Sequence, residues 1–392
     1  ALRSLRLLGQ VDRLPETAKG LAESSHELED TATKLEGLYE NALVLEALGD
    51  QEACITALRE GALIAEREGQ WREVARTKTR LIWMVGHVRA RPKEGRVWAQ
   101  NADASLAYLK ERGEDTRTLR AHYLNNLAAV HFSTGDFDAA FETYQRSREL
   151  WSQLHGPEHP TVMRALTNMG SVHFSRGELA EAAAAYREVI DYRKATLGES
   201  HPSVALTLAN LGSVLQEQGD REGALSIAEE VLALRSKVMD PDHPHLARAH
   251  HQLAVVLGSI GEYERAEQEH LRALDIQRKT LGETHPDVAF SLNSLGSVAE
   301  RLGDTQRAES LYREAIEHVM THQGADHQNA ALTWLNLGDL LRRQGKHLEA
   351  RDAHERALAH YEGIDPDHPR TMLALSHLSL DLLELGEAER AL

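Results

Sequence analysis

Apolar residues recur along the chain at the spacing of amphipathic helices, and a glycine separates each pair of apolar stripes. In residues 287–321, Leu295 and Val298 belong to one stripe, Ala308 belongs to the next, and Gly303 lies between them. Glycine at this place supplies the left-handed conformation that commonly ends a helix. No segment alternates polar and apolar residues with a period of two over a useful length, so strands are not expected. The pattern predicts a series of helical hairpins.

The turn glycine returns at a fixed interval. Its spacing is 42 residues over six positions and 41 residues at the last step: Gly135, Gly177, Gly219, Gly261, Gly303, Gly345 and Gly386. A fixed period of this length indicates a stacked repeat protein. Each hairpin would bury one face against its partner helix and another against the next repeat, so an isolated unit would not fold.

A histidine–proline pair precedes many of the predicted hairpins, at His159, His201, His243, His285 and His368. Proline suits the first position of a helix and keeps the residue before it out of the helical conformation. Zinc requires ligands about 2 Å from one ion, whereas packed helices are about 10 Å apart, so this ladder of histidines cannot share a metal. We expect the pair to be a structural joint, and a pH-sensitive surface role is the alternative.

Several repeats resemble the tetratricopeptide repeat. Residues 334–357 carry the pattern at Trp334, Leu337, Gly338, Gly345, Ala350 and Ala357. The standard unit has about 34 residues, and the 42-residue form with a His-Pro pair is similar to the repeat of kinesin light chains and their bacterial relatives. The resemblance is strong over residues 115–392, and residues 1–114 resemble degenerate hairpins of the same kind. It implies an all-α fold, a tetratricopeptide-type helical-hairpin solenoid that is one continuous right-handed superhelix.

Composition narrows the class of protein. The net charge of −17 argues against a nucleic-acid partner, because such affinity depends on basic residues that neutralise phosphates. No run of 18 apolar residues occurs, so a membrane span is not expected. The single cysteine, Cys54, fits a reducing compartment and therefore a cytoplasmic location. No nucleophile elbow, phosphate-binding loop or zinc-protease motif is present, so neither catalysis nor a cofactor or metal is expected.

The candidate binding residues lie on the first helix of each hairpin, which in the resembling family lines a concave, peptide-binding surface. The position before a recurrent leucine often carries an asparagine, which is a poor residue for a helix interior without another reason. An amide both donates and accepts hydrogen bonds, so it could hold a peptide backbone, or it could instead bond between helices of the stack. Nearby arginines would favour an acidic peptide. The predicted groove residues are Asn125, Asn126, Arg164, Asn168, Asn210, Arg248, Gln252, Asn293, Asn336 and Arg342.

These observations favour a scaffold that binds a peptide or helix of a partner protein in its groove. By resemblance to bacterial arrays, we expect it to be the sensor or docking region of a larger signalling protein such as a Ser/Thr kinase. Gly9 and residues 385–392 indicate half-units at the two ends, so we expect a piece of a longer chain. The alternatives are an accessory region of an enzyme whose catalytic domain lies outside these residues, and an array that self-associates through exposed terminal half-repeats.

Overall fold

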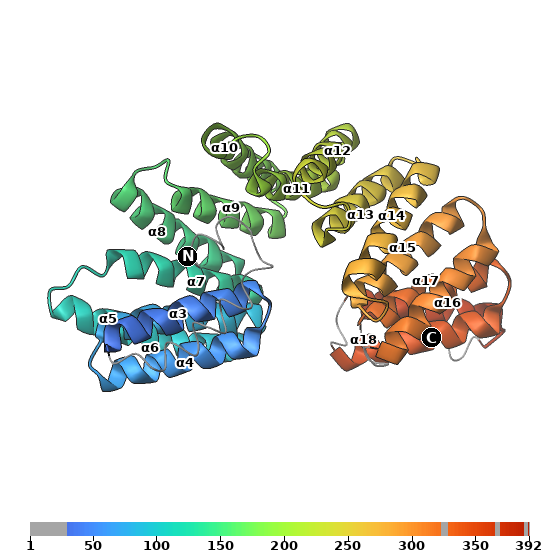
Figure 1. The fold of residues 1–392 in the computed structure, drawn as a ribbon. Helices are drawn as coiled ribbons and strands as arrows, with labels where there is room; N and C mark the ends of the chain where they lie inside the picture. Colours follow the sequence, from blue (N-terminus) through green and yellow to red (C-terminus); the bar gives the residue numbers. More distant parts are fainter. Residues whose placement is uncertain (1–29, 323–327, 365–368, 388–390, 392) are drawn as a thin grey trace. The chain divides into compact units, whose positions relative to one another are not determined.

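The computed structural model describes residues 30–322, 328–364, 369–387 and 391. Within these ranges every regular element is a helix, which confirms the all-α, helical-hairpin prediction (Figure 1). The chain divides into two compact units, residues 1–192 and 193–392. The expectation of half-units at the ends concerns Gly9 and the last residues, and both lie largely outside the described ranges. None of the described helices is long and apolar enough to cross a membrane.

In the first unit each helix packs against the next along the chain. Its elements are α3 (Thr31–Ala47), α4 (Gln51–Arg67), α5 (Trp71–Leu81), η2 (Ile82–Val88), α6 (Pro92–Glu111), α7 (Arg117–Ser133), α8 (Phe137–His155), α9 (Pro160–Ser175) and most of α10 (Leu179–Leu197). The predicted boundary between residues 114 and 115 falls in the connection between α6 and α7. Its assignment as a change from degenerate to regular repeats stays a prediction.

The second unit is also built of helical hairpins, in which successive helices from residue 202 onward pack against one another. Its elements after α10 are α11 (Pro202–Glu217), α12 (Arg221–Val238), α13 (Pro244–Ser259), α14 (Tyr263–Leu281), α15 (Pro286–Arg301), α16 (Thr305–His322), α17 (Gln328–Arg343), α18 (His347–Ile364) and α19 (Pro369–Glu384). The turn glycines have φ between 74° and 87° in the described 42-residue series, as at Gly135 and Gly261. Residues with a Cβ rarely adopt this conformation, so glycine is needed there.

The histidine–proline pairs are helix starts, as the sequence predicted. In α9, α11, α13 and α15 the histidine is the N-cap residue and the proline is the first helical residue. The histidine also has a role that the sequence did not indicate, because its Nδ1 accepts the backbone N–H two residues further on. That distance is 3.2 Å from Asp287 N to His285 Nδ1. The imidazole therefore satisfies a donor that a helix start otherwise leaves unpaired. His368 lies outside the described residues.

Close packing within a hairpin pairs a glycine of the first helix with a large ring of the second. A Cβ added to Gly170 would lie 2.9 Å from the Tyr186 ring, and one on Gly296 would lie 2.7 Å from the Tyr312 ring. Both rings are buried. The ring position recurs every 42 residues and holds Tyr144, Tyr186, Ala228, His270, Tyr312 and His354. The three positions without tyrosine, Ala228, His270 and His354, all lie in the second unit.

The first unit has an irregularity of its own at the end of α5. The helix that begins as α5 continues as the π-helical segment η2, and Ala90 follows with a φ of 51°. Gly86 of η2 lies against Gly95 of α6, where a Cβ on Gly86 would be 3.0 Å from the Gly95 Cα. A π-helical turn rotates the residues before it relative to those after it. This rotation affects how α5 and η2 face the polar cavity of the first unit, which is lined by residues of both segments.

Candidate peptide-binding site

A polar cavity of the first unit has a volume of about 510 Å³. It is lined by side chains from α3, α5, η2, α7 and α9. Four of the predicted groove residues meet there: Asn125, Asn126, Arg164 and Asn168. The prediction named them from their place in the repeat, and the structure adds that they share one concave surface.

A row of arginines on α5 forms one wall of this cavity. Arg72, Arg76 and Arg80 are four residues apart and therefore lie on one face of the helix. Arg76 Nη1 lies 2.5 Å from Glu36 Oε2, and its guanidinium stacks 3.7 Å from the centre of the Tyr39 ring. Arg80 pairs with Glu46. The sequence analysis missed this row, although the four-residue spacing was visible in residues 71–81.

Arg164 differs from the arginines of that row, because none of the described carboxylates lies within ion-pair distance of it. Desolvation by the surrounding protein, followed by repulsion from Arg80, lowers the pKa of the Arg164 guanidinium. Its side chain is nevertheless exposed to solvent at the edge of the cavity. Neighbouring cations destabilise this charge, so the approach of a carboxylate lowers its free energy. A bidentate arginine–carboxylate pair is the strongest contact of this kind.

His122 of α7 also lines this cavity, as a neutral group. Burial is the main cause that lowers its pKa to about 4, and Arg164, Arg80 and Arg76 lower it further. Its ring packs edge-on against Trp151, with 4.8 Å between the ring centres. The other arginines of the cavity are matched by carboxylates, because Glu46 and Glu73 belong to its lining. Glu36 and Glu114 also pair with Arg76 and Arg72. Arg164 is therefore the arginine of this set that lacks such a pair among the described residues.

The predicted amides form a chain of hydrogen bonds between neighbouring helices. Asn168 Nδ2 donates to Asn125 Oδ1 at 3.2 Å, Asn125 Nδ2 donates to Asn126 Oδ1 at 3.3 Å, and Asn126 Nδ2 donates to the Thr79 carbonyl at 2.8 Å. Asn125 and Asn126 are buried, whereas Asn168 is partly exposed. An amide has two donor hydrogens and two acceptor lone pairs. The Asn168 amide can therefore form further hydrogen bonds on the side of the cavity.

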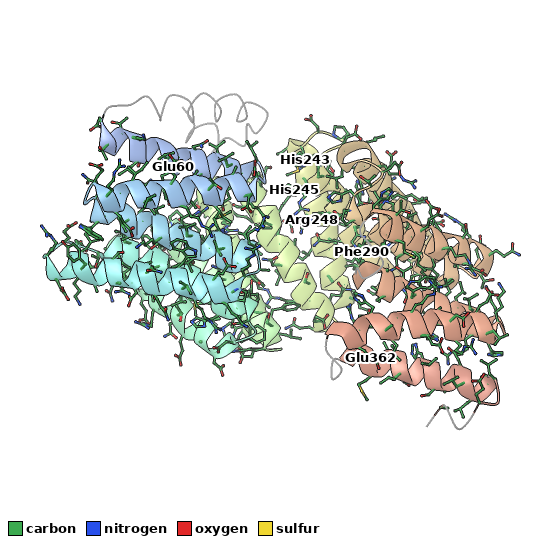
Figure 2. The ribbon with its side chains drawn as sticks, turned by 90° about the horizontal axis from the view of Figure 1, so that it is seen from below. Glu60, His243, His245, Arg248, Phe290 and Glu362 are labelled. Atoms are coloured by element: carbon green, nitrogen blue, oxygen red, sulfur yellow. The ribbon has the colours of Figure 1, made fainter. Side chains whose placement is uncertain are left out.

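The second unit repeats this amide pairing once. Asn336 Nδ2 donates to Asn293 Oδ1 at 2.9 Å. Asn210 is partly exposed on α11, and Arg342 is bonded to Asp339 at 2.8 Å. Arg248 of α13 and Phe290 of α15, both labelled in Figure 2, are exposed and occupy the same repeat position as Arg164. The structure thus places the predicted residues of this unit on first helices without gathering them into one polar cavity.

Gln252 belongs to a different kind of cavity in the second unit. It lines an apolar space of about 170 Å³ between α11, α12 and α13, together with Gly212, Ala228 and His251. Ala228 holds the ring position that is tyrosine in other repeats, and Gly212 holds the facing glycine position. The cavity is therefore the space that the missing ring would fill.

The comparisons with known proteins identify the family. The tetratricopeptide repeat family model matches residues 119–195, 163–237, 203–279, 245–319 and 329–392, so the chain belongs to this family. A search of curated proteins finds no significant match.

Among three solved structures that are similar to this chain, two have a TM-score above 0.5 and share its fold. One is a kinesin light chain protein of Podosopora anserina with nearly identical repeats, which has 23% identity, a TM-score of 0.47 and coverage of 54% of this chain and 99% of that one. The apo form of RapI has 16% identity, a TM-score of 0.60 and coverage of 81% and 83%. A Rap protein complexed with Competence and Sporulation Factor has 14% identity, a TM-score of 0.53 and coverage of 93% and 99%.

Proposed function

We propose that the chain is a tetratricopeptide scaffold that binds an extended, acidic segment of a partner protein, and that the polar cavity of the first unit is the binding site. Helical repeat arrays present extended concave surfaces that bind partners. The observation that carries the proposal is Arg164, a cation at the cavity edge with none of the described carboxylates to pair with it. A carboxylate of the partner would supply that pair.

The same surface offers hydrogen bonds to a peptide backbone. The partly exposed Asn168 amide lies in the cavity with Arg164, so a backbone amide next to an acidic side chain could be held at the same time. Trp83 also lines the cavity, and its Nε1 is fixed by donating to Glu46 at 3.2 Å. Its ring would pack against an apolar part of the bound segment.

A library of short fluorescent peptides that differ in acidic content tests this proposal. We expect peptides rich in Asp and Glu to bind. We expect Arg164→Gln to lower the affinity for the selected peptide about 10-fold, which is the contribution of one charge-assisted hydrogen bond. Arg187→Gln is the matched control, because it removes the same charge from an exposed position on α10, the second helix of its hairpin. Equal affinity of the wild type and Arg164→Gln, or no preference for acidic peptides, would overturn the proposal.

At the level of the whole protein, we infer that such a module serves as the docking region of a larger signalling protein, as the sequence analysis expected. The fold similarity to a Rap protein complexed with Competence and Sporulation Factor fits an array that binds a partner. The full-length gene product tests this inference directly, because a catalytic domain joined to the array would assign the array to docking. An array that continues as repeats alone would favour a pure scaffold.

A further inference from the structure

Three potential metal ligands converge near the end of the second unit, on three successive helices. They are Asp339 of α17, His354 of α18 and His377 of α19, and their ligand atoms all lie within 4.8 Å of one another. Asp339 Oδ1 is 3.2 Å from His377 Nδ1 and 3.7 Å from His354 Nε2. In a tetrahedral zinc site with bonds of about 2.0–2.1 Å, neighbouring ligand atoms are about 3.3 Å apart. The observed separations therefore suit one shared ion.

His354 is oriented as a zinc-binding histidine would be. Its side chain is 0% exposed, and its Nδ1 lies 2.5 Å from Oδ2 of Asp381, which is also 0% exposed. Since a carboxylate accepts, Nδ1 carries the proton and Nε2 presents a lone pair toward Asp339. Nε2 is buried and has no hydrogen-bond partner among the described residues. A buried nitrogen without a partner costs free energy, and a metal ion would satisfy it.

The second histidine, His377, also has a buried ring nitrogen that lacks a partner. This atom is Nδ1, which has no hydrogen-bond partner among the described residues. Arg342 completes the surroundings, because its Nη2 donates to Asp339 Oδ1 at 2.8 Å and its Nε lies 3.8 Å from Asp381 Oδ1. Hydrogen bonds of this kind fix the carboxylates of metal sites.

The three ligand positions hold other residue types in most repeats of this chain, and His270 is the exception at the position of His354. His354 replaces the tyrosine found at Tyr186 and Tyr312, and His377 replaces the asparagine found at Asn336 and other repeats. Asp339 stands where other repeats have serine: Ser171, Ser213 and Ser297. Three replacements by ligand-type residues at one point in space are not required by the packing, since the other repeats form the same hairpins without them.

We propose that Asp339, His354 and His377 bind a zinc ion, with Asp381 holding His354 in the ligating tautomer. Two imidazoles and one carboxylate suit zinc, whereas calcium and magnesium prefer oxygen ligands throughout. Three protein ligands leave a fourth position, and the side chains of Asp339 and His377, which are 26% and 18% exposed, show that solvent reaches this side. The ion would tie α17, α18 and α19 together and stabilise this end of the unit.

Zinc titration by isothermal calorimetry on the chelator-treated chain tests the proposal, with cobalt(II) absorption as a second readout of tetrahedral geometry. His354→Tyr and His377→Asn install the residues that other repeats carry, so the hairpins should fold without the ligand. We expect one tight zinc equivalent in the wild type and a loss of at least about 100-fold in affinity in each variant. His322→Asn, which removes an exposed histidine of α16, is the control and should leave the tight site intact.

Two outcomes would overturn the proposal. One is the absence of a tight equivalent in the wild type, and the other is equal binding by the wild type and both variants, which would mean adventitious binding to surface histidines only. Circular dichroism of the metal-free proteins shows whether each variant folds. If His354→Tyr were unfolded, His377→Asn decides alone, because its side chain is partly exposed and its replacement is the amide of neighbouring repeats.

Discussion

The side-chain amide of Asn126 donates to the backbone carbonyl of Thr79, with 2.8 Å between Nδ2 and O. Thr79 lies two residues before the end of α5, where the helix changes from α to π geometry. The change from i+4 to i+5 pairing disturbs the backbone ladder at this junction. Asn126 is buried and supplies a donor there, so this amide of the predicted groove has a structural task in addition to any contact with a ligand.

We predict that Asn126→Ala lowers the free energy of unfolding of the first unit by about 1–3 kcal/mol, because it removes two buried hydrogen bonds, one to the Thr79 carbonyl and one from the Asn125 amide. Asn168→Ala is the comparison, since its amide is partly exposed and water can replace the lost bond. Urea denaturation followed by circular dichroism measures both. A larger loss of stability for Asn168→Ala than for Asn126→Ala would contradict this account of the amide chain.

The histidine caps predict a second effect on stability. His285→Ala removes the acceptor for the Asp287 N–H and should cost about 1 kcal/mol, the usual value of an N-cap side chain. His285→Asn should retain most of the stability, because asparagine is itself a preferred N-cap residue. Thermal unfolding of the two variants side by side gives the measurement. If alanine and asparagine were equivalent, the imidazole would not act as a cap.

The buried histidines of the second unit predict how stability depends on pH. Burial, with a smaller contribution from His251, lowers the pKa of His270 to about 3, and burial lowers that of His251 to about 4. In the unfolded chain both groups titrate near 6.5, so the unfolded state binds more protons as the pH falls below 6.5. Stability is therefore complete above that pH and is lost progressively toward the folded-state values.

His270→Tyr tests this pH dependence with the residue that other repeats have at the same position. Each neutral buried histidine contributes up to about 1.4 kcal/mol per pH unit to the slope. Between pH 6.5 and about 4.5, we expect the free energy of unfolding of the variant to depend less on pH, by the equivalent of about one bound proton. Below this range the titration of carboxylates dominates the pH dependence. Urea unfolding at several pH values measures it, and an unchanged slope would show that His270 is protonated in the folded protein.

The apolar cavity predicts that a larger side chain stabilises the second unit. Ala228→Tyr restores the ring position next to Gly212, in a space of about 170 Å³. Filling a cavity typically adds about 0.5–2 kcal/mol, so we expect a higher midpoint of thermal unfolding. Ala266→Tyr, at a fully buried alanine of α14 that does not line this cavity, is the overpacking control and should destabilise. A lower midpoint for Ala228→Tyr would mean that neighbouring side chains already close the space.

The sequence was sufficient for the helical hairpins, for the helix starts at the histidine–proline pairs of α9, α11, α13 and α15, and for the family, because all of these depend on periodicity within one repeat. Gly303 and the His285–Pro286 pair could be assigned from local backbone preferences alone. The role of His285 Nδ1 as an acceptor was not visible in the sequence, since it depends on a side-chain rotamer.

The candidate site was predictable only in part. Asn126 and Arg164 were named from their repeat position, but their cavity also needs the arginines of α5, which lie in the irregular part of the chain. The cluster of Asp339, His354 and His377 comes from three different helices, and each residue alone resembles an ordinary surface or packing residue. Convergence of this kind depends on how successive hairpins are packed, which the spacing within a repeat does not specify.

Hydrogen exchange of the chain with and without its best acidic peptide tests most directly whether the polar cavity of the first unit binds an acidic segment. The account predicts slower amide exchange in α5, α7 and α9, the helices that carry Arg76, Asn126 and Arg164, and loss of that protection in Arg164→Gln at the same peptide concentration. Protection confined to helices of the second unit, or protection that Arg164→Gln leaves unchanged, would contradict it.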